Sequence, residues 1–571
     1  MLIRYASMLV GGLALAACAT PQNDPAVSQP SQISYGAVTA ADPRTQEAGE
    51  EILRAGGSAT DAAIAVMLAL TVVEPQSSGI GGGGFMVRGE ANGSVVTWDG
   101  RETAPAAATP DWFLAEDGSV PPFMESVLSG LSVGVPGNIA LAAKSHEAHG
   151  KLPWARLFEP AIRLARDGFV VNPRLNQSLS GSKDRAAFSE AGRTLYFDAD
   201  GNALAVGTVL RNPELAATFE RIAQAGPDAF YSGAAARDLA QTVAENTPKP
   251  DAMTEADIAG YEARQRDAVC SDYRGYRICS MGPPTSGGIA VQQMLGQLER
   301  FDLSALGPNN PVTWHLFVES QRLAYADREL YLADSDFVTV PVEGLIDPNY
   351  MASRSALIAT DSTMASVQAG SPPGASSAMA DGDEPEEHGT SHFAVVDRNG
   401  TMVSYTSTVE GAFGSGLMSG GFFLNNELTD FSRSPTVDGR LVANRVEGGK
   451  RPRSSMAPTV VYDPQGKPFM AVGAAGGSTI PVTTARAIIG AIDFGLDAES
   501  ALALPFLMAF GDQLLLEEGT WLAVQAEDFR TLGHDDIVIR AAPIKGGALL
   551  YRGGIWQSAR DPRLDGQLEL P

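Results

Sequence analysis

Residues 387–397 read EHGTSHFAVVD, and this stretch places a threonine where a polar linker meets a buried strand. The preceding segment, 361–389, is rich in Gly, Ser, Pro and acidic residues, and an unstructured segment of this length is usually functional or disordered. From Thr390 onward, SHFAVVD, a turn at Asn399-Gly400 and TMVSYTSTV predict a strand, a tight turn and a second strand. We therefore expect Thr390 at the first position of a strand, at the edge of an exposed loop that can be cut.

A threonine at such a boundary can serve as a nucleophile. Its hydroxyl is weakly nucleophilic and needs a nearby base. If the peptide bond before Thr390 is cut, the new α-amine, with a pKa of about 8, lies beside the hydroxyl and can act as that base. Threonines that begin strands are also common for structural reasons alone, so this single motif leaves both interpretations open.

The flanking sequence predicts layers of helix and sheet. Helices are expected at 43–55 and 59–73, with Gly56-Gly57 ending the first and Ser58 or Thr60 capping the second. The second helix is apolar nearly all round, so it should be sandwiched between other elements. Further predicted elements are a hairpin turning at Asn92-Gly93, a largely helical region at 130–260, strands at 457–463 and 469–475, and a helix from about 481 to 494. This pattern indicates an α+β fold.

The composition is that of a soluble globular protein. The chain has 571 residues, too many for one small core, so at least two lobes or one large composite domain are expected. Its net charge of -26 would repel a phosphate backbone, which argues against nucleic-acid binding. No segment after the N-terminus carries about eighteen unbroken apolar residues, so no internal membrane span is expected.

The N-terminus predicts export. One basic residue, Arg4, precedes a short apolar run from Ala6 to Ala17, which fits a secretory signal peptide over 1–17. The run ends in LAAC, which resembles the lipobox of bacterial lipoproteins, and this implies that Cys18 becomes the lipidated first residue of the mature chain. Residues 18–34 are rich in Pro, Ser and Gln and would form a flexible tether.

The resulting expectation is a lipid anchor on the periplasmic face of the cell envelope. Ala19 follows Cys18, where an aspartate would favour retention in the inner membrane, so the outer membrane is expected if the source has one. A plain secretory signal, cleaved nearby without lipidation, remains the alternative.

The other two cysteines, Cys270 and Cys279, flank a possible hairpin turn at Arg274-Gly275. Counted outward from the turn they form a non-hydrogen-bonded pair, whose Cα separation of about 4.5 Å suits a disulfide. An oxidising compartment would close this bond, and two buried free thiols are the alternative.

Three other motifs are weaker. GLSVG at 130–134 matches the G-x-S-x-G nucleophile elbow, with Ser132 as nucleophile, but no apolar strand precedes it, and a turn before a helix explains it better. GIGGGGF lacks the Gly-Lys-Ser/Thr of a P-loop. HEAH, ending at His149, has the wrong spacing for a zinc helix and is expected at a solvated helix end. No metal site and no cofactor are expected.

Eight motifs together carry a family resemblance. They are GIGGGGFMV, WDGRETAPAAAT, GLSVGVPGN and YRICSMGPPTSGGIAVQQML before Thr390, and GTSHFAVVD, GSGLMSGGFFLNNELTDFS, KRPRSSMAPTVV and GAAGGSTI from Gly389 onward. In order and spacing the chain resembles the gamma-glutamyltranspeptidase family, also called glutathione hydrolases, of the N-terminal-nucleophile superfamily. The resemblance covers the chain from about Tyr35 and weakens beyond Phe494, apart from SARDPR.

The resemblance implies a four-layer αββα fold built from two subunits of one self-cleaved precursor. Cleavage between Gly389 and Thr390 would give a large subunit, 35–389, and a small catalytic subunit, 390–571, which stay together as a heterodimer. Thr390 would then be the nucleophile and Thr408 its hydroxyl partner. Gly476 and Gly477 would form the oxyanion hole, and glycines ahead of a helix also leave backbone N–H groups free for this role.

The resemblance also implies a pocket for a γ-glutamyl group, whose end carries a carboxylate and an ammonium. Arg101 would bind the carboxylate through its planar guanidinium, and Ser454 and Ser455 would add hydroxyl donors. The acidic residues expected at the ammonium are Asp430, Glu427 and Glu410.

The implied activity is a γ-glutamyl hydrolase or transferase acting on glutathione and related small molecules, with water, an amino acid or a peptide as acceptor. Two departures from the family pattern stand out. Ser391 replaces a frequent second threonine, which should be tolerated. Residues 432–449, at the place of the family's lid loop, look shortened and lack a tyrosine, which favours hydrolysis or a bulkier leaving group.

Two alternatives remain at this point. One is an acylase of the same family that removes glutaryl-type side chains from cephalosporins. The other is a non-catalytic envelope protein that keeps the fold as a binding module.

Overall fold

The computed structural model describes residues 35–376, 379–380, 382 and 389–569. The expected signal peptide, Cys18 and the tether lie outside the described residues, as do residues 383–388, immediately before Gly389. None of the helices within these ranges combines the length and the apolar character needed to cross a bilayer.

A six-stranded antiparallel sheet carries Thr390. Its strands, in spatial order, are β1 (Gly36–Ala40), β9 (Gly389–Asp397), β10 (Met402–Glu410), β2 (Gly83–Gly89), β3 (Val95–Gly100) and β6 (Arg264–Arg266). The strand β9 begins at Gly389, so Thr390 occupies its second position rather than the predicted first. The predicted turns at Asn92-Gly93 and Asn399-Gly400 join β2 to β3 and β9 to β10, as expected.

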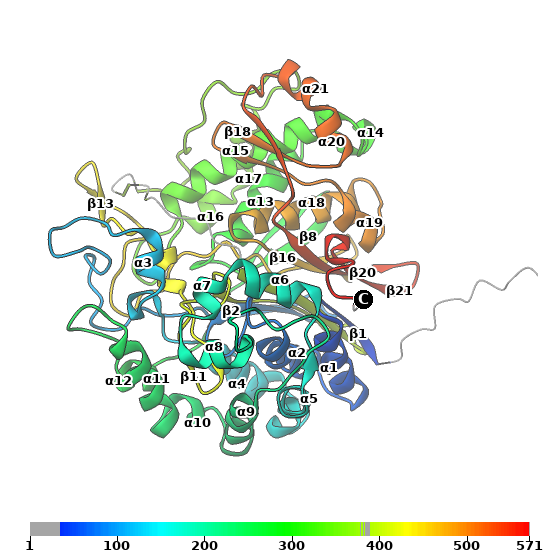
Figure 1. The fold of residues 1–571 in the computed structure, drawn as a ribbon. Coiled ribbons are helices and arrows are strands. Elements are labelled where there is room, and N and C mark those ends of the chain that lie inside the picture. Colours follow the sequence, from blue (N-terminus) through cyan, green and yellow to red (C-terminus); the bar gives the residue numbers. More distant parts are fainter. Residues whose placement is uncertain (1–34, 377–378, 381, 383–388, 570–571) are drawn as a thin grey trace, which may run out of the picture. The chain divides into compact units, whose positions relative to one another are not determined.

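A second six-stranded antiparallel sheet lies face to face with the first (Figure 1). Its strands, in spatial order, are β21 (Ile555–Arg560), β20 (Lys545–Arg552), β16 (Pro468–Ala475), β15 (Thr459–Tyr462), β8 (Tyr276–Ser280) and β7 (Val269–Tyr273). The Ser404 hydroxyl of β10 donates to the Val472 carbonyl of β16 at 3.0 Å. The His392 ring of β9 packs on Gly473, where a Cβ would lie only 2.5 Å from a ring atom. A side chain at position 473 would therefore displace the His392 ring.

Helices cover the outer face of each sheet (Figure 1). The first sheet is covered by α1 (Pro43–Arg54), α2 (Ala59–Val73) and α4 (Asn138–His149), with α5 (Trp154–Asp167) packed on α2. The second is covered by α13 (Gly287–Leu298), α18 (Ile480–Ile492) and α19 (Ala498–Ala503), with α15 (Pro311–Tyr331) packed on α13. Every residue of α2 is buried, which confirms that this apolar helix is enclosed on all sides. Ser58 caps α2 in a reciprocal capping box with Asp61. The result is a mixed fold of two central sheets between two helical layers.

The chain forms further helices and short strands outside these two sheets and their covering helices. The helices are α3 (Phe123–Val127), α6 (Pro173–Gly181), α7 (Lys183–Ala186), α8 (Glu190–Tyr196), α9 (Pro213–Ala225), α10 (Asp228–Tyr231), α11 (Gly233–Glu245), α12 (Glu255–Ala259), α14 (Leu303–Leu306), α16 (Val342–Leu345), α17 (Pro348–Ser355), α20 (Trp521–Val524) and α21 (Ala526–Thr531). The strands are β4 (Phe169–Val170), β5 (Val209–Leu210), β11 (Met418–Ser419), β12 (Phe422–Phe423), β13 (Thr436–Val437), β14 (Arg440–Leu441), β17 (Leu507–Phe510), β18 (Gln513–Glu517) and β19 (Ile537–Arg540). The largely helical character predicted for 130–260 is confirmed.

The strands β7 and β8 form a hairpin that turns at Arg274 and Gly275, both with positive φ. Cys270 and Cys279 are register partners in this hairpin, with Cα atoms 4.2 Å apart, and they form a disulfide. The bond ties the edge strand of the second sheet to its neighbour.

Candidate active site

The hydroxyls of Thr390 and Thr408 face each other across β9 and β10. The two residues are register partners, and their Oγ1 atoms lie 3.1 Å apart. Thr408 Oγ1 donates to the carbonyl oxygen of Gly389 at 2.9 Å and accepts from the amide of Glu410 at 2.8 Å. Because the single Thr408 proton is given to Gly389, Thr390 must be the donor in the threonine pair. The Thr390 oxygen therefore keeps its lone pairs available, with its proton directed toward Thr408.

A bulge at the end of β10 shapes this corner of the site. The register shifts between Thr408 and Glu410, so Val409 is an extra residue in the strand. Glu410 has a φ of 72°, a conformation that is costly for a side chain with a Cβ. Bulges and strained residues of this kind concentrate at functional sites, where they redirect a side chain.

A cavity of about 810 Å³ opens beside the two threonines. Its lining includes most of the predicted catalytic and substrate-binding residues: Arg101, Thr390, Thr408, Glu410, Asp430, Ser454, Ser455 and Gly477. Glu427 lies against Arg101 but is fully buried, and Gly476 precedes Gly477 in the chain. Segments from both sides of the Gly389–Thr390 bond thus form one site.

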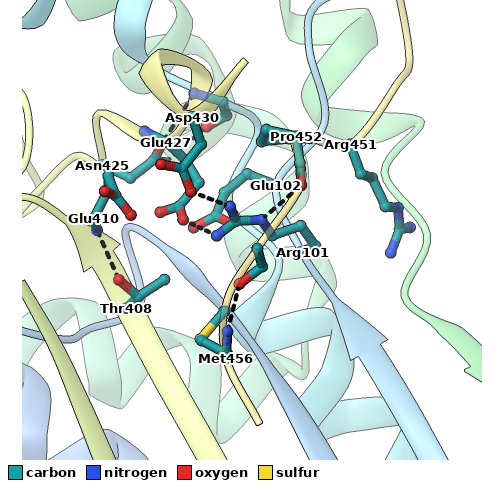
Figure 2. Close-up of polar contacts among 12 residues, drawn as sticks. Arg101, Glu102, Thr408, Glu410, Asn425, Glu427, Asp430, Arg451, Pro452 and Met456 are labelled. Carbon is teal, nitrogen blue, oxygen red and sulfur yellow. Dashed lines mark hydrogen bonds and ion pairs between the residues drawn. The ribbon is translucent and has the colours of Figure 1, made fainter. Parts of the chain in front are cut away.

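Arg101 lies at the centre of the charged part of this site, as Figure 2 shows. The residue is 1% exposed, and its guanidinium forms ion pairs with both Glu427 and Asp430. Arg101 Nε donates to the Pro452 carbonyl at 3.1 Å, and Nη2 donates to the Arg453 carbonyl at 3.0 Å. These contacts fix the plane of the guanidinium. Arg101, predicted to bind the carboxylate of a ligand, is therefore in direct contact with Glu427 and Asp430, predicted to bind its ammonium. A ligand carboxylate would share Arg101 with these two acids.

The carboxylates of Glu410, Glu427 and Asp430 each offer an oxygen within 4.8 Å of the others. Such a group suits a cation, but Arg101 already pairs with two of its members. A divalent metal placed there would be repelled by this guanidinium at short range. The cluster fits an ammonium group that approaches from the cavity better than a metal ion.

Glu102 is a buried acid that the sequence did not single out. It is fully buried beside Arg101, with 3.9 Å between Arg101 Nη1 and Glu102 Oε2, and neither carboxyl oxygen has a hydrogen-bond partner among the described residues. Burial raises the pKa of Glu102 to about 8 despite the nearby arginine. The side chain is therefore largely neutral at pH 7. In the sequence, the only indication that Glu102 belongs to the site is its position directly after Arg101 in RETAP.

Two glycines form a turn between β16 and α18. Gly476 has a φ of 131° and Gly477 a φ of 60°, both in the region that favours glycine. A Cβ at Gly476 would lie 2.5 Å from the Pro543 carbonyl oxygen, so no other residue fits. The turn lies just before the N-terminus of α18, where the helix dipole also favours negative charge. This arrangement can stabilise an oxyanion.

Ser391 points away from the cavity into a buried charged network. Its hydroxyl donates to Glu74 at 2.6 Å, and Lys545 Nζ lies 3.5 Å from the same carboxylate. Burial lowers the pKa of Lys545 to about 7. A serine hydroxyl satisfies the Glu74 contact, which gives a reason why serine is acceptable at position 391.

Three other sequence expectations can be compared with the structure. Ser132 is fully buried and donates to the carbonyls of Val127 and Ser129, so it is no exposed nucleophile. The helix α4 ends at His149, as expected, with Glu147 and Ala148 exposed and both histidines partly buried. The His146 ring contacts the Leu152 carbonyl at 2.8 Å. Residues 432–449 contain the short hairpin β13–β14, and none of them lines the cavity.

Two further residues of the lining, Tyr325 and Arg328, also went unrecognised in the sequence. Both lie on α15, before Thr390, and both contact turns that come after Thr390. Nothing in the local pattern of α15 distinguishes them from the other polar residues of this long helix.

Known proteins are similar to this chain in sequence and in fold. The family model described as Gamma-glutamyltranspeptidase matches residues 45–569. The glutathione hydrolase proenzyme of Bacillus subtilis (strain 168) is 38% identical over 480 residues, which cover 82% of this chain and 80% of that protein. The glutathione hydrolase proenzyme of Escherichia coli (strain K12) is 36% identical over 527 residues, covering 90% and 89%. The crystal structure of cephalosporin acylase from Bacillus halodurans matches with a TM-score of 0.82 and 27% identity, over 96% of this chain and 98% of that one.

Proposed function

This chain belongs to the gamma-glutamyltranspeptidase family, and from this premise we propose that it is a self-processing γ-glutamyl hydrolase and transferase with Thr390 as nucleophile. Its substrates are glutathione and related γ-glutamyl compounds. The observation that carries the proposal is the 3.1 Å contact between the Thr390 and Thr408 hydroxyls, at the wall of a cavity that also contains Arg101 and Asp430.

Self-cleavage would begin with attack of Thr390 Oγ1 on the carbonyl carbon of Gly389. The hydroxyl proton passes toward Thr408, the negative charge develops on the Gly389 oxygen, and the Gly389–Thr390 C–N bond breaks as the nitrogen takes up a proton. The product is an ester between Gly389 and Thr390 with a free α-amine on Thr390. Water hydrolyses this ester, which leaves a carboxylate on Gly389 and two associated subunits, 35–389 and 390–571, in an N-terminal-nucleophile fold.

The processed site would use the same hydroxyl on the substrate. The Thr390 α-amine takes the hydroxyl proton as Oγ1 attacks the γ-glutamyl carbonyl, and it returns this proton to the leaving amine. Backbone N–H groups of Gly476 and Gly477 would hold the oxyanion. Water then hydrolyses the γ-glutamyl ester, or an amino acid or peptide accepts the acyl group.

The charges of the cavity support a substrate that carries both signs at one end. Arg101, with the hydroxyls of Ser454 and Ser455, would bind the α-carboxylate. Asp430, supported by Glu427 and Glu410, would bind the α-ammonium. Each ligand group would replace part of the existing pairing between Arg101 and these acids, so the ligand exchanges ion pairs rather than burying unpaired charge.

A second candidate is an acylase that accepts glutaryl-type groups. The structural similarity to a cephalosporin acylase favours it, and so does the absence of residues 432–449 from the cavity wall, which leaves room for a bulky leaving group. A glutaryl group lacks the ammonium and would have no use for Asp430. The acidic cluster is the reason why γ-glutamyl substrates are preferred in this proposal.

We also propose that the protein acts on the periplasmic face of the cell envelope, tethered through Cys18. The support is the sequence of residues 1–18 together with the Cys270–Cys279 disulfide, which suits an oxidising compartment.

The experiment that tests the function uses the purified protein with a γ-glutamyl anilide. Release of the aniline and a γ-glutamyl adduct on the peptide that begins with Thr390 are expected. An intact chain that releases no aniline would contradict the proposal.

A further inference from the structure

Arg328 lies at the junction between the two parts of the chain that form the cavity. It is 8% exposed, lies on α15 and lines the cavity. Arg328 Nη2 donates to Ser455 Oγ at 2.9 Å, and Nε donates to Ser286 Oγ at 2.9 Å. The remaining nitrogen, Nη1, pairs with Glu329. One guanidinium therefore binds a hydroxyl of the predicted carboxylate-binding turn and a hydroxyl behind that turn.

The hydrogen-bond directions at Ser455 follow from the chemistry of arginine. A guanidinium has donors and no acceptor, so Ser455 Oγ must accept from Arg328. The single Ser455 proton then remains available for an acceptor in the cavity. Ser454 is arranged in the same way, because its Oγ accepts from the Met456 amide at 3.1 Å. Both hydroxyls are thus set as donors, and a carboxylate offers only acceptors.

Ser286 extends the contact of Arg328 to Ser454. The Ser286 hydroxyl accepts from Arg328 Nε and donates to the Ser454 carbonyl at 2.6 Å. The Ser286 amide donates to the same carbonyl at 2.8 Å. Arg328 therefore restrains Ser455 directly and the backbone of Ser454 through one intermediate side chain.

We propose that Arg328 is a positioning residue for the substrate carboxylate: it holds the Ser455 hydroxyl as a donor that points into the cavity. This inference rests on the proposed function, since it requires that Ser455 contacts the α-carboxylate of the substrate. A lysine cannot replace Arg328 fully, because one ammonium on a flexible stem cannot reproduce the planar fork that reaches both Ser455 and Ser286.

Tyr325 provides a matched control on the same helical face. It lies one turn before Arg328, with 5.7 Å between the Arg328 guanidinium carbon and the Tyr325 ring centroid. The Tyr325 hydroxyl donates to the Ser478 carbonyl, directly after the Gly476-Gly477 turn. Tyr325 thus supports the turn at the reacting carbonyl, whereas Arg328 supports the turn at the far end of the ligand.

The test compares two anilide substrates. The γ-glutamyl anilide carries carboxylate and ammonium, and the 4-aminobutyryl anilide keeps the ammonium but lacks the carboxylate. We expect Arg328→Met to lower kcat/KM for the γ-glutamyl anilide about 10- to 100-fold, mainly through KM, which corresponds to the loss of a hydrogen bond to a charged group. For the 4-aminobutyryl anilide the change should stay within about threefold. Arg328→Lys should give an intermediate loss with the same substrate dependence.

Tyr325→Phe should instead lower kcat for both substrates alike. The double variant Arg328→Met/Ser455→Ala should be little worse than Ser455→Ala, because Arg328 acts through Ser455. The inference would be overturned if the Arg328 variants lost kcat/KM equally on both substrates. It would also be overturned if the losses of the two single variants added fully in the double variant. If Arg328→Met fails to fold into the two-subunit enzyme, Arg328→Lys decides between these outcomes.

The Ser455→Ala variant separates this inference from the proposed function. If Ser455→Ala itself leaves the preference for the carboxylate-bearing substrate unchanged, Ser455 does not contact the carboxylate and that part of the proposed function fails. If Ser455→Ala reduces the preference and neither Arg328 variant does, only the inference about Arg328 fails.

Discussion

The Thr408 hydroxyl donates a hydrogen bond to the carbonyl oxygen of Gly389 at 2.9 Å. This oxygen would carry the developing negative charge if Thr390 attacked the peptide bond. The same donor lies 3.1 Å from the attacking oxygen, so one side chain contacts both the nucleophile and the electrophile. The uncut chain is therefore arranged for an internal reaction at this bond.

From this geometry we expect Thr408→Val to slow self-cleavage by about 100-fold or more, in the range found when an oxyanion donor is removed. Thr408→Ser keeps the hydroxyl and should be cut at close to the normal rate. The measurement is a time course of intact mass after purification. Cleavage of the valine variant at the wild-type rate would show that the Gly389 contact has no role in the reaction.

Thr390→Ala should remain a single chain and release no aniline from a γ-glutamyl anilide, because both proposed reactions use the Thr390 hydroxyl. Thr390→Ser should be cut and retain part of the activity. Intact-mass and N-terminal analysis provide the measurement, and the wild-type small fragment should begin with Thr390. A cut and active alanine variant would exclude the proposed mechanism.

Much of the fold around the Gly389–Thr390 bond could be predicted, because the sequence patterns that indicate its elements are local. The apolar helix 59–73 and the turns at Asn92-Gly93 and Asn399-Gly400 depend on periodicity and turn chemistry within a few residues. The pairing of β1 with β9 was not predictable, because it joins segments about 350 residues apart through tertiary packing alone.

The site residues that could be predicted lie in recognisable sequence motifs. The site residues that were not predicted lie outside such motifs. Arg101 and Asp430 were identified, but their direct ion pair appears only when the chain is folded. Arg328 and Tyr325 lie on a helix whose polar residues would normally be assigned to solvent. Arg328 is buried and Tyr325 is partly buried because the turns after Thr390 pack against them.

Asp430→Asn separates the two candidate activities. Asp430 pairs with Arg101 and lines the cavity, where it would meet the substrate ammonium. We expect the variant to lose about 10- to 100-fold in kcat/KM on a γ-glutamyl anilide, as for a lost charged contact, and less than about threefold on a glutaryl anilide, which has no ammonium. A wild-type enzyme that prefers the glutaryl anilide would favour the acylase instead.

Glu102 should make substrate affinity depend on pH. Burial raises its pKa to about 8, so the carboxyl is mostly neutral at pH 7 and becomes charged at higher pH. The added negative charge beside Arg101 would weaken the attraction of this arginine for the substrate carboxylate. We expect KM for a γ-glutamyl anilide to rise between pH 7 and pH 9 in the wild type.

The matched variant is Glu102→Gln, which stays neutral throughout and should show a smaller rise in KM. Ionisation of the Thr390 α-amine and of the substrate ammonium occurs in both proteins, so the difference between the two profiles isolates Glu102. Identical profiles would mean that Glu102 does not change its charge in this range.

His392 should make the folded protein sensitive to acid. Its ring is buried between the two sheets, with Nδ1 2.9 Å from Thr406 Oγ1 and no hydrogen-bond partner for Nε2 among the described residues. Burial lowers the pKa of His392 to about 3, whereas an unfolded histidine has a pKa of about 6.5. Below pH 6.5 the unfolded chain therefore binds a proton on this residue that the folded chain does not bind.

The free energy of unfolding should consequently fall as the pH decreases, by about 1.4 kcal/mol for each unit between pH 6.5 and pH 3 from this group alone. Replacement by a side chain that does not titrate, His392→Gln, removes this contribution while carboxylate titration elsewhere continues. We expect the wild type to lose more thermal stability than the variant between pH 7 and pH 4.5, measured as the shift of the unfolding midpoint at one scan rate. Equal shifts in both proteins would mean that His392 is protonated in the folded state or reaches solvent, which the packing of its ring on Gly473 argues against.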